Sequence, residues 1–164
     1  TRLIGVGEAG RKAMSKMSDV IWSIDSRRDT VGDLLQRMQE HADDVLLPLD
    51  IRYTFNVEGL ADKSRKVPGN KRQDLYFIYK EAINNIARHS NATKASIYLG
   101  NRGQEFEMLV KDNGTPTDGF EAKKSAKSGQ GLANLQMRAQ RLNATMQLET
   151  NLGYAIHLRM KRFA

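Results

Sequence analysis

The sequence has no cysteine, three prolines and a single tryptophan among its 164 residues. The absence of cysteine excludes a disulfide framework and a thiolate zinc site. No apolar run approaches the roughly 18 residues that are needed to cross a bilayer, and the first ten residues lack the apolar core of a signal peptide. We therefore expect a cytoplasmic domain that is not inserted in a membrane. The sequence starts without Met, so the question of a membrane anchor upstream of residue 1 stays open.

Apolar residues make up 40% of the chain, which is enough for the core of one globular domain with a short appendage. Lys and Arg number 26 against 19 Asp and Glu, giving a formal net charge of +7. Such an excess favours anionic partners, including nucleotides, nucleic acid and anionic lipid. The basic residues are scattered apart from a cluster at Lys123, Lys124 and Lys127. Charge alone therefore does not predict nucleic-acid binding, and we expect none.

Hydrophobic spacing predicts a chain in which helices and strands alternate. The expected helices cover residues 8–25, 31–47, 71–90 and 132–142, and the expected strands cover residues 51–57, 94–99, 104–111, 145–150 and 154–160. Short turns between neighbouring strands favour antiparallel pairing. The fold class is thus a two-layer α/β sandwich (α+β) with a mixed, mostly antiparallel sheet and helices on one face. The polar segment 112–130 has no periodicity, which is typical of a lid or binding loop.

A polar stripe interrupts the apolar helix that is expected at residues 71–90. Glu81, Asn85 and His89 are four residues apart, and each step of four rotates about 40° past a full turn. The three side chains therefore follow one line along the helix. A carboxylate and an amide oxygen one turn apart can hold a divalent cation and a water. A solvated face with ordinary helix pairs is the alternative interpretation.

Two further features lie at the ends of expected elements. Asp112-Asn113-Gly114 directly follows a strand, where an Asp can accept a hydrogen bond from an exocyclic amine and Gly lets a flat ring approach. A plain turn is the alternative. Ser128-Gly129-Gln130-Gly131-Leu132 opens a helix, where exposed backbone N–H groups and the helix dipole attract an anion. A flexible, glycine-rich helix entry is the alternative.

The order of these features resembles a known family. Glu-x-x-x-Asn on a helix, Asp-x-Gly after a strand and Gly-x-Gly before a helix resemble the GHKL (Bergerat-type) ATPases, which include histidine kinases, DNA gyrase, Hsp90 and mismatch-repair proteins. EAINNIARHSNATKASIYL and GQGLANLQMRAQRLNA resemble nucleotide boxes of sensor kinases related to the nitrate sensors and to DesK-type kinases. MSKMSDVIWSID resembles the second helix of their dimerisation segment. The resemblance covers about residues 10–160.

The resemblance implies the ATP-binding catalytic domain of a two-component sensor histidine kinase, with ATP and Mg²⁺ as cofactors. Residues 1–47 would be a remnant of the dimerisation and phosphotransfer helices, and residues 48–164 would be the catalytic domain. The full-length protein would be a homodimer that passes the γ-phosphoryl to its own histidine and then to a response regulator.

By position, the resemblance implies roles for individual residues. Glu81 would be the catalytic residue, orienting or activating a water or a metal-bound group. Asn85 would be the Mg²⁺ ligand, and Asp112 would bind the adenine amino group. The other residues that the resemblance assigns to nucleotide binding are Asn84, Arg88, His89, Gly114, Lys127, Gly129, Gly131 and Leu132.

The sequence also departs from the family. Pro116 stands where a second Gly is usual, and Tyr154 follows Gly153 where Thr is usual, so either can reshape the adenine pocket or lower its affinity. No histidine stands in a phosphoacceptor setting, and we interpret His41 and His157 as ordinary surface or strand positions. We therefore expect nucleotide binding without autophosphorylation. A catalytically silent interaction module of the same fold and a basic nucleic-acid-binding domain are the alternatives.

Overall fold

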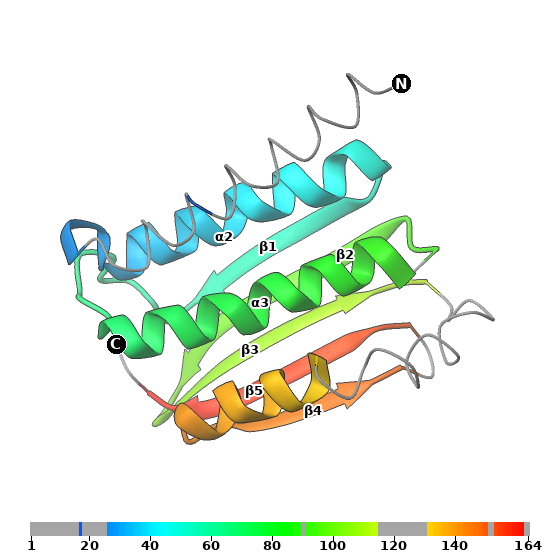
Figure 1. Ribbon diagram of the computed structural model, residues 1–164. Coiled ribbons are helices and arrows are strands. Elements are labelled where there is room, and N and C mark those ends of the chain that lie inside the picture. Colours follow the sequence, from blue (N-terminus) through cyan, green and yellow to red (C-terminus); the bar gives the residue numbers. More distant parts are fainter. Residues whose placement is uncertain (1–16, 18–25, 90, 115–130, 151–152, 163–164) are drawn as a thin grey trace.

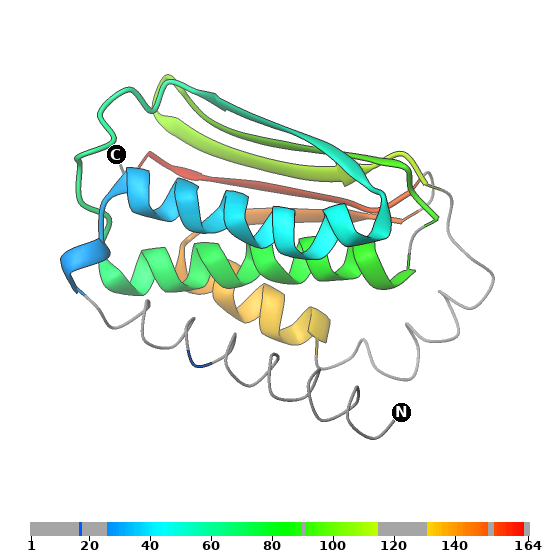
Figure 2. The same cartoon turned by 90° about the horizontal axis from the view of Figure 1, so that it is seen from above.

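A computed structural model describes residues 17, 26–89, 91–114, 131–150 and 153–162. One five-stranded sheet forms the first layer and helices on one of its faces form the second, as the two views show (Figure 1, Figure 2). Apart from Met17, which is helical, the expected helix over residues 8–25 lies outside the described residues, as does most of the expected loop over residues 112–130. No helix in the described part of the chain combines the length and the apolarity that crossing a membrane requires.

The sheet is mixed, as the sequence predicts. Its strands are β1 (Arg52–Glu58), β2 (Lys94–Arg102), β3 (Glu105–Asp112), β4 (Thr145–Glu149) and β5 (Ala155–Lys161). They lie in the order β1-β2-β3-β5-β4, with β1 parallel to β2 and every other neighbouring pair antiparallel. Strand β2 is longer than expected, because the turn to β3 is confined to residues 103–104. Gly103, at φ +60°, permits a turn this tight.

Two long helices lie side by side on one face of the sheet, the first along the edge strand β1 and the second over the middle (Figure 1). Helix α2 (Val31–Leu46) begins at Thr30, whose hydroxyl accepts a hydrogen bond from the Asp33 N–H at 3.2 Å while the Asp33 carboxylate accepts one from Thr30. This reciprocal cap fixes the first turn. Helix α3 (Gly69–His89) lies beside α2 (Figure 1).

Helix α2 is part of the same core as α3 and the sheet. Its buried residues are Val31, Leu34, Leu35, Met38, Ala42 and Leu46. The Tyr79 hydroxyl of α3 donates to the Met38 carbonyl at 2.6 Å. The core is therefore continuous across residue 47, where the sequence predicts a domain boundary. The relation of the residues before α2 to a dimerisation segment stays a prediction.

The third helix on this face comprises residues 131–141. Asp74 of α3, only 4% exposed, fixes its position: the Asp74 carboxylate accepts from Arg138 at 3.0 Å and from Arg141 at 2.5 Å. The Arg138 guanidinium also lies 4.2 Å from the centre of the Phe77 ring. These contacts hold the helix against α3, next to β4 and β5 (Figure 1).

The fold brings the C-terminal turns of α3 and the C-terminal end of β3 to the same end of the molecule (Figure 1). Strand β5 runs antiparallel to β3, so it begins at this end too. Polar side chains at this end come from segments that are far apart in the sequence.

Candidate functional site

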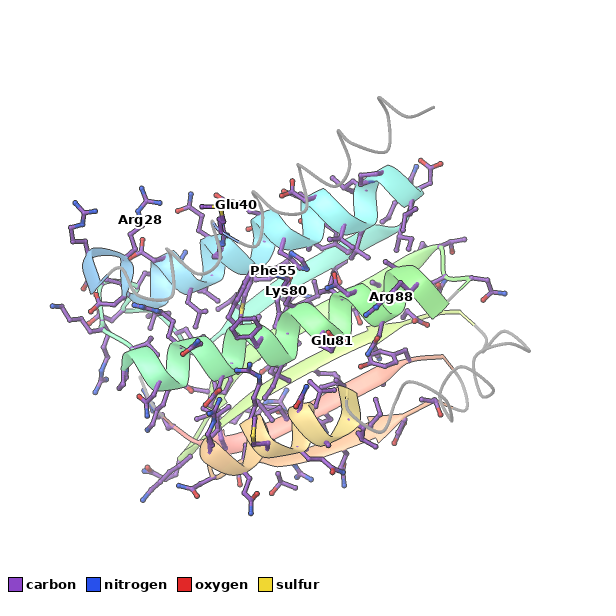
Figure 3. All side chains as sticks on the ribbon, viewed as in Figure 1. Arg28, Glu40, Phe55, Lys80, Glu81 and Arg88 are labelled. Carbon is purple, nitrogen blue, oxygen red and sulfur yellow. The ribbon has the colours of Figure 1, made fainter. Side chains whose placement is uncertain are left out.

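One side of the site is built on the last turns of α3. One Arg88 guanidinium nitrogen lies 3.2 Å from Glu81 Oε1 and 3.4 Å from Asn85 Oδ1. Glu81 and Arg88 both project from the C-terminal half of the helix (Figure 3). Because a guanidinium only donates hydrogen bonds, both oxygens must be turned toward the same point. The two oxygens therefore converge on a positive charge, an arrangement that suits a cation.

The other side of the site is Asp112, the last residue of β3. Its Oδ1 accepts hydrogen bonds from the backbone N–H groups of Gly114, at 2.8 Å, and Tyr154, at 3.3 Å. Its Oδ2 is buried and has no hydrogen-bond partner among the described residues. Burial of an unpaired carboxylate oxygen is costly. Asp112 is thus a turn residue through Oδ1 and an unsatisfied acceptor through Oδ2.

Glycine at two neighbouring positions leaves room for this carboxylate. Gly153 has φ +102°, and a Cβ there would lie 2.6 Å from both Asp112 Oδ1 and the Gly114 carbonyl oxygen. Gly114 is buried. A side chain at residue 153 would therefore displace Asp112, in addition to the strain of a positive φ.

Asn113 anchors this corner to β2, a role that the sequence analysis missed. Its Oδ1 accepts from the backbone N–H groups of Thr93 and Lys94 at 3.0 and 2.9 Å, and its Nδ2 donates to the Thr93 hydroxyl. The Asn-Gly pair predicts a turn. It does not predict which strand the Asn side chain will bind, because that depends on how the strands pair.

Tyr154 connects the two sides, although in the sequence it stands out only as a departure from the family. It is 5% exposed, and its hydroxyl oxygen accepts a hydrogen bond from Asn85 Nδ2 at 3.0 Å. Its carbonyl accepts from the Asp112 N–H at 3.0 Å. Burial raises the pKa of the Tyr154 phenol, so the side chain is neutral at ordinary pH. The alternation of Tyr154 with Ile156 and Leu158 is the one signal in the sequence that it points inward.

Asn84 is not brought together with Glu81 and Asn85. Its Oδ1 lies 3.2 Å from His41 Nε2, so its side chain is engaged with α2. His41 also makes edge contacts with the rings of Tyr76 and Tyr79, at centroid distances of 6.3 and 6.4 Å. The interpretation of His41 as an ordinary surface position is therefore wrong: the imidazole is half-buried between the two helices. A helical pattern does not reveal which neighbouring helix a polar side chain meets.

The expected phosphate side of the site is described only in part. Gly131 and Leu132 begin the described helix over residues 131–141, and a Cβ at Gly131 would meet no described atom within 4 Å. Packing within the described residues therefore does not explain a glycine there. Lys127, Gly129 and Pro116 lie outside the described residues, as does the side chain of His89.

The chain is similar to known proteins in sequence and in fold. The chain is 28% identical to the sensor histidine kinase MctS of Rhizobium johnstonii, over 79% of this chain and 32% of MctS. It is 35% identical to the sensor protein VraS of Staphylococcus aureus, over 51% of this chain and 23% of VraS. The chain thus spans less than a third of the length of these curated relatives. No protein-family model matches it.

The fold matches that of solved histidine kinase structures. The catalytic domain of histidine kinase ThkA superposes with a TM-score of 0.58 and 12% sequence identity, covering 80% of this chain and 93% of the ThkA domain. At 12% sequence identity, this match shows a shared fold and nothing more.

Proposed function

We propose that this chain, a catalytic domain of the sensor histidine kinase type, binds ATP with Mg²⁺ between the last turns of α3 and the end of β3. The single observation that carries the proposal is the buried Asp112 Oδ2, which has no partner among the described residues. The adenine amino group is a donor of the kind that this oxygen lacks. Gly153 leaves the space beside the carboxylate free, because a Cβ there would lie 2.6 Å from Asp112 Oδ1.

The donor set on α3 fits a magnesium ion. Glu81 Oε1 and Asn85 Oδ1 already flank one cationic nitrogen of Arg88. Magnesium keeps several waters and needs few protein ligands, so Asn85 Oδ1 with phosphate oxygens suffices to hold it. When bound, the ion would neutralise charge on the phosphates.

The remaining roles follow from the chemistry of each side chain. The Glu81 carboxylate, 38% exposed, can orient a hydrogen-bond donor at the reacting end of the nucleotide. Arg88, 57% exposed, is free to turn its guanidinium from Glu81 toward phosphate oxygens. Gly129, Gly131, Leu132, Lys127 and His89 are proposed to complete the phosphate side, and Asn84 to support it from the α2 side.

For the whole protein, we propose a homodimeric, cytoplasmic kinase domain. The γ-phosphoryl would pass to a histidine and then to an aspartate of a response regulator. None of the three histidines of this chain is proposed as the acceptor. The residues before α2 are proposed to derive from the dimerisation segment, with the catalytic domain following.

Calorimetric titration with a non-hydrolysable ATP analogue tests the proposal. The parent should bind the analogue, more tightly with Mg²⁺ than with EDTA, and Asp112→Asn should weaken binding at least about tenfold because a charged hydrogen bond contributes roughly 1.5–3 kcal/mol. Asp62→Asn is the matched control, because Asp62 also caps a turn, through Ser64, but is far from the site in an exposed loop. A parent that binds no nucleotide would instead favour the catalytically silent module.

A further inference from the structure

The Tyr154 hydroxyl lies against Asn85, the residue that is proposed to bind magnesium. The hydroxyl oxygen is 3.0 Å from Asn85 Nδ2, and the Tyr154 side chain is almost fully buried. No role for this residue follows from the family, which usually has a much smaller Thr here.

The surroundings of Asn85 favour only one orientation of its amide. Arg88 approaches from one side with donors only, so the amide must present its oxygen there. If the amide were flipped, two donors would face each other across 3.4 Å. In the observed orientation, Nδ2 finds an acceptor in the Tyr154 hydroxyl. The phenol stays neutral because burial raises its pKa, so it keeps both its acceptor lone pairs and its proton.

The hydroxyl itself is fixed from the opposite side of the site. The Tyr154 N–H donates to Asp112 Oδ1, and its carbonyl accepts from the Asp112 N–H. Gly153 directly before it has φ +102° and no space for a Cβ. The backbone at residues 153–154 therefore cannot shift without moving Asp112. A chain of contacts runs from the base-binding carboxylate through Tyr154 to the Asn85 amide.

We propose that Tyr154 is a positioning residue that holds the Asn85 amide with its oxygen turned toward the cation, so that the adenine and magnesium ends of the site are set by one side chain. The inference rests on the proposed function of Asn85. Without the hydroxyl, the terminal amide torsion of Asn85 has a broad, two-fold profile, and Nδ2 loses its partner. The oxygen would then spend less time facing the cation.

Tyr154→Phe removes only the hydroxyl and is the test variant. Tyr79→Phe is the matched control, since Tyr79 is also a buried tyrosine with a hydrogen-bonded hydroxyl, but its partner is the Met38 carbonyl in the α2–α3 interface. Affinity for the ATP analogue is measured with Mg²⁺ and with EDTA. We expect Tyr154→Phe to lose about fivefold to tenfold in affinity with Mg²⁺ and to bind within about twofold of the parent in EDTA. Tyr79→Phe should bind as the parent does in both.

A second measurement needs no nucleotide. The side-chain amide resonances of Asn85, assigned by their loss in Asn85→Ala, should shift and exchange faster with water in Tyr154→Phe and stay unchanged in Tyr79→Phe. An unchanged Asn85 amide in Tyr154→Phe, or an equal loss of affinity with Mg²⁺ and EDTA, would overturn the inference. If the parent itself binds no nucleotide, the proposed function fails, and the amide resonances alone decide whether Tyr154 orients Asn85.

Discussion

Asp112 divides its two carboxylate oxygens between the fold and the site. Oδ1 ties the end of β3 to Gly114 and to the start of β5, whereas Oδ2 has no hydrogen-bond partner within the described part of the chain. An Asp at a strand end predicts either a turn or a ligand contact, and the sequence offered both interpretations. In the structure Oδ1 makes the turn contacts, and Oδ2 is the oxygen that we propose for the ligand contact.

The space around Asp112 yields a prediction for Gly153. Gly153→Ala should destabilise the domain by about 2–4 kcal/mol, since it combines a positive φ with a Cβ 2.6 Å from Asp112 Oδ1. Gly103→Ala is the control, because Gly103 has φ +60° but nothing within 4 Å of a Cβ, so only about 1–2 kcal/mol should be lost. Urea denaturation measures both. Equal losses would mean that contact with Asp112 adds nothing.

Arg88 should matter for binding and not for folding. Its ion pair with Glu81 is exposed on both sides, at 57% and 38%, and such pairs contribute about 0–1 kcal/mol. Arg88→Ala should therefore unfold within about 0.5 kcal/mol of the parent but bind the ATP analogue about tenfold more weakly, through the loss of charged donors. Arg102→Ala, an exposed arginine over the Tyr98 ring on β2, is the control for charge alone. Equal affinities of the two variants would contradict the role of Arg88.

Spacing along one helix was enough to predict that two side chains of the candidate site lie side by side. Glu81 and Asn85 share a helix face by arithmetic, and the structure brings Arg88 to the same two oxygens. Tyr154 was not predictable as a partner of Asn85, because the contact spans 69 residues and depends on the register of β5 against β3. The contact of Asn84 with His41 was not predictable for the same reason, because it depends on how α2 packs against α3.

At the level of elements, the sequence predicted the described α-helices and strands to within a few residues, but not what each of them packs against. The apolar stripe of α2 shows that one face is buried, yet an amphipathic pattern does not say against what. The structure answers this: α2 packs on α3 and on the sheet, and Met38 and Ala42 are fully buried. The sequence also did not predict which strands pair in parallel. Strands β1 and β2 are parallel neighbours because α3 forms the crossover connection between them.

If α2 belongs to the catalytic core, its buried face must contribute to stability. Met38→Ala should destabilise the domain by about 2–5 kcal/mol, the usual range for truncating a fully buried Met. Gln39→Ala, the exposed neighbour on the same helix, should stay within about 0.5 kcal/mol of the parent. The measurement is urea denaturation in the chain as it stands. A small loss for Met38→Ala would mean that residues 48–164 hold together without α2, as the sequence-based boundary predicts.

At the scale of the molecule, long-range side-chain contacts among the described residues join α3 to the elements around it. The Asp74 ion pairs join α3 to the helix over residues 131–141, the Tyr79 hydroxyl joins α3 to α2, and the Tyr154 hydroxyl joins α3 to the start of β5. Helix α3 is thus the common partner.

Two of these contacts use buried tyrosines, which makes the stability of the fold sensitive to alkaline pH. Burial raises the pKa of both Tyr79 and Tyr154 above the ordinary value near 10. Below pH 10 both states carry the phenol protons and stability does not depend on them. Above pH 10 the unfolded chain releases these protons while the folded chain keeps them, so the free energy of unfolding falls as pH rises. The slope is about 1.4 kcal/mol per pH unit for each tyrosine.

Urea denaturation at pH 9, 10, 10.5 and 11 checks this prediction, with absorbance at 295 nm reporting phenolate in the folded state. The parent should lose roughly 2–3 kcal/mol between pH 10 and pH 11 from the two tyrosines together. Tyr79→Phe and Tyr154→Phe should each be less stable than the parent at pH 9 but show a slope reduced by about 1.4 kcal/mol per pH unit. Because lysines ionise in the same range in every variant, only the difference in slope counts. Identical slopes in the parent and both variants would mean that neither hydroxyl is protected from ionisation, and that water reaches the contacts of α3 with α2 and β5.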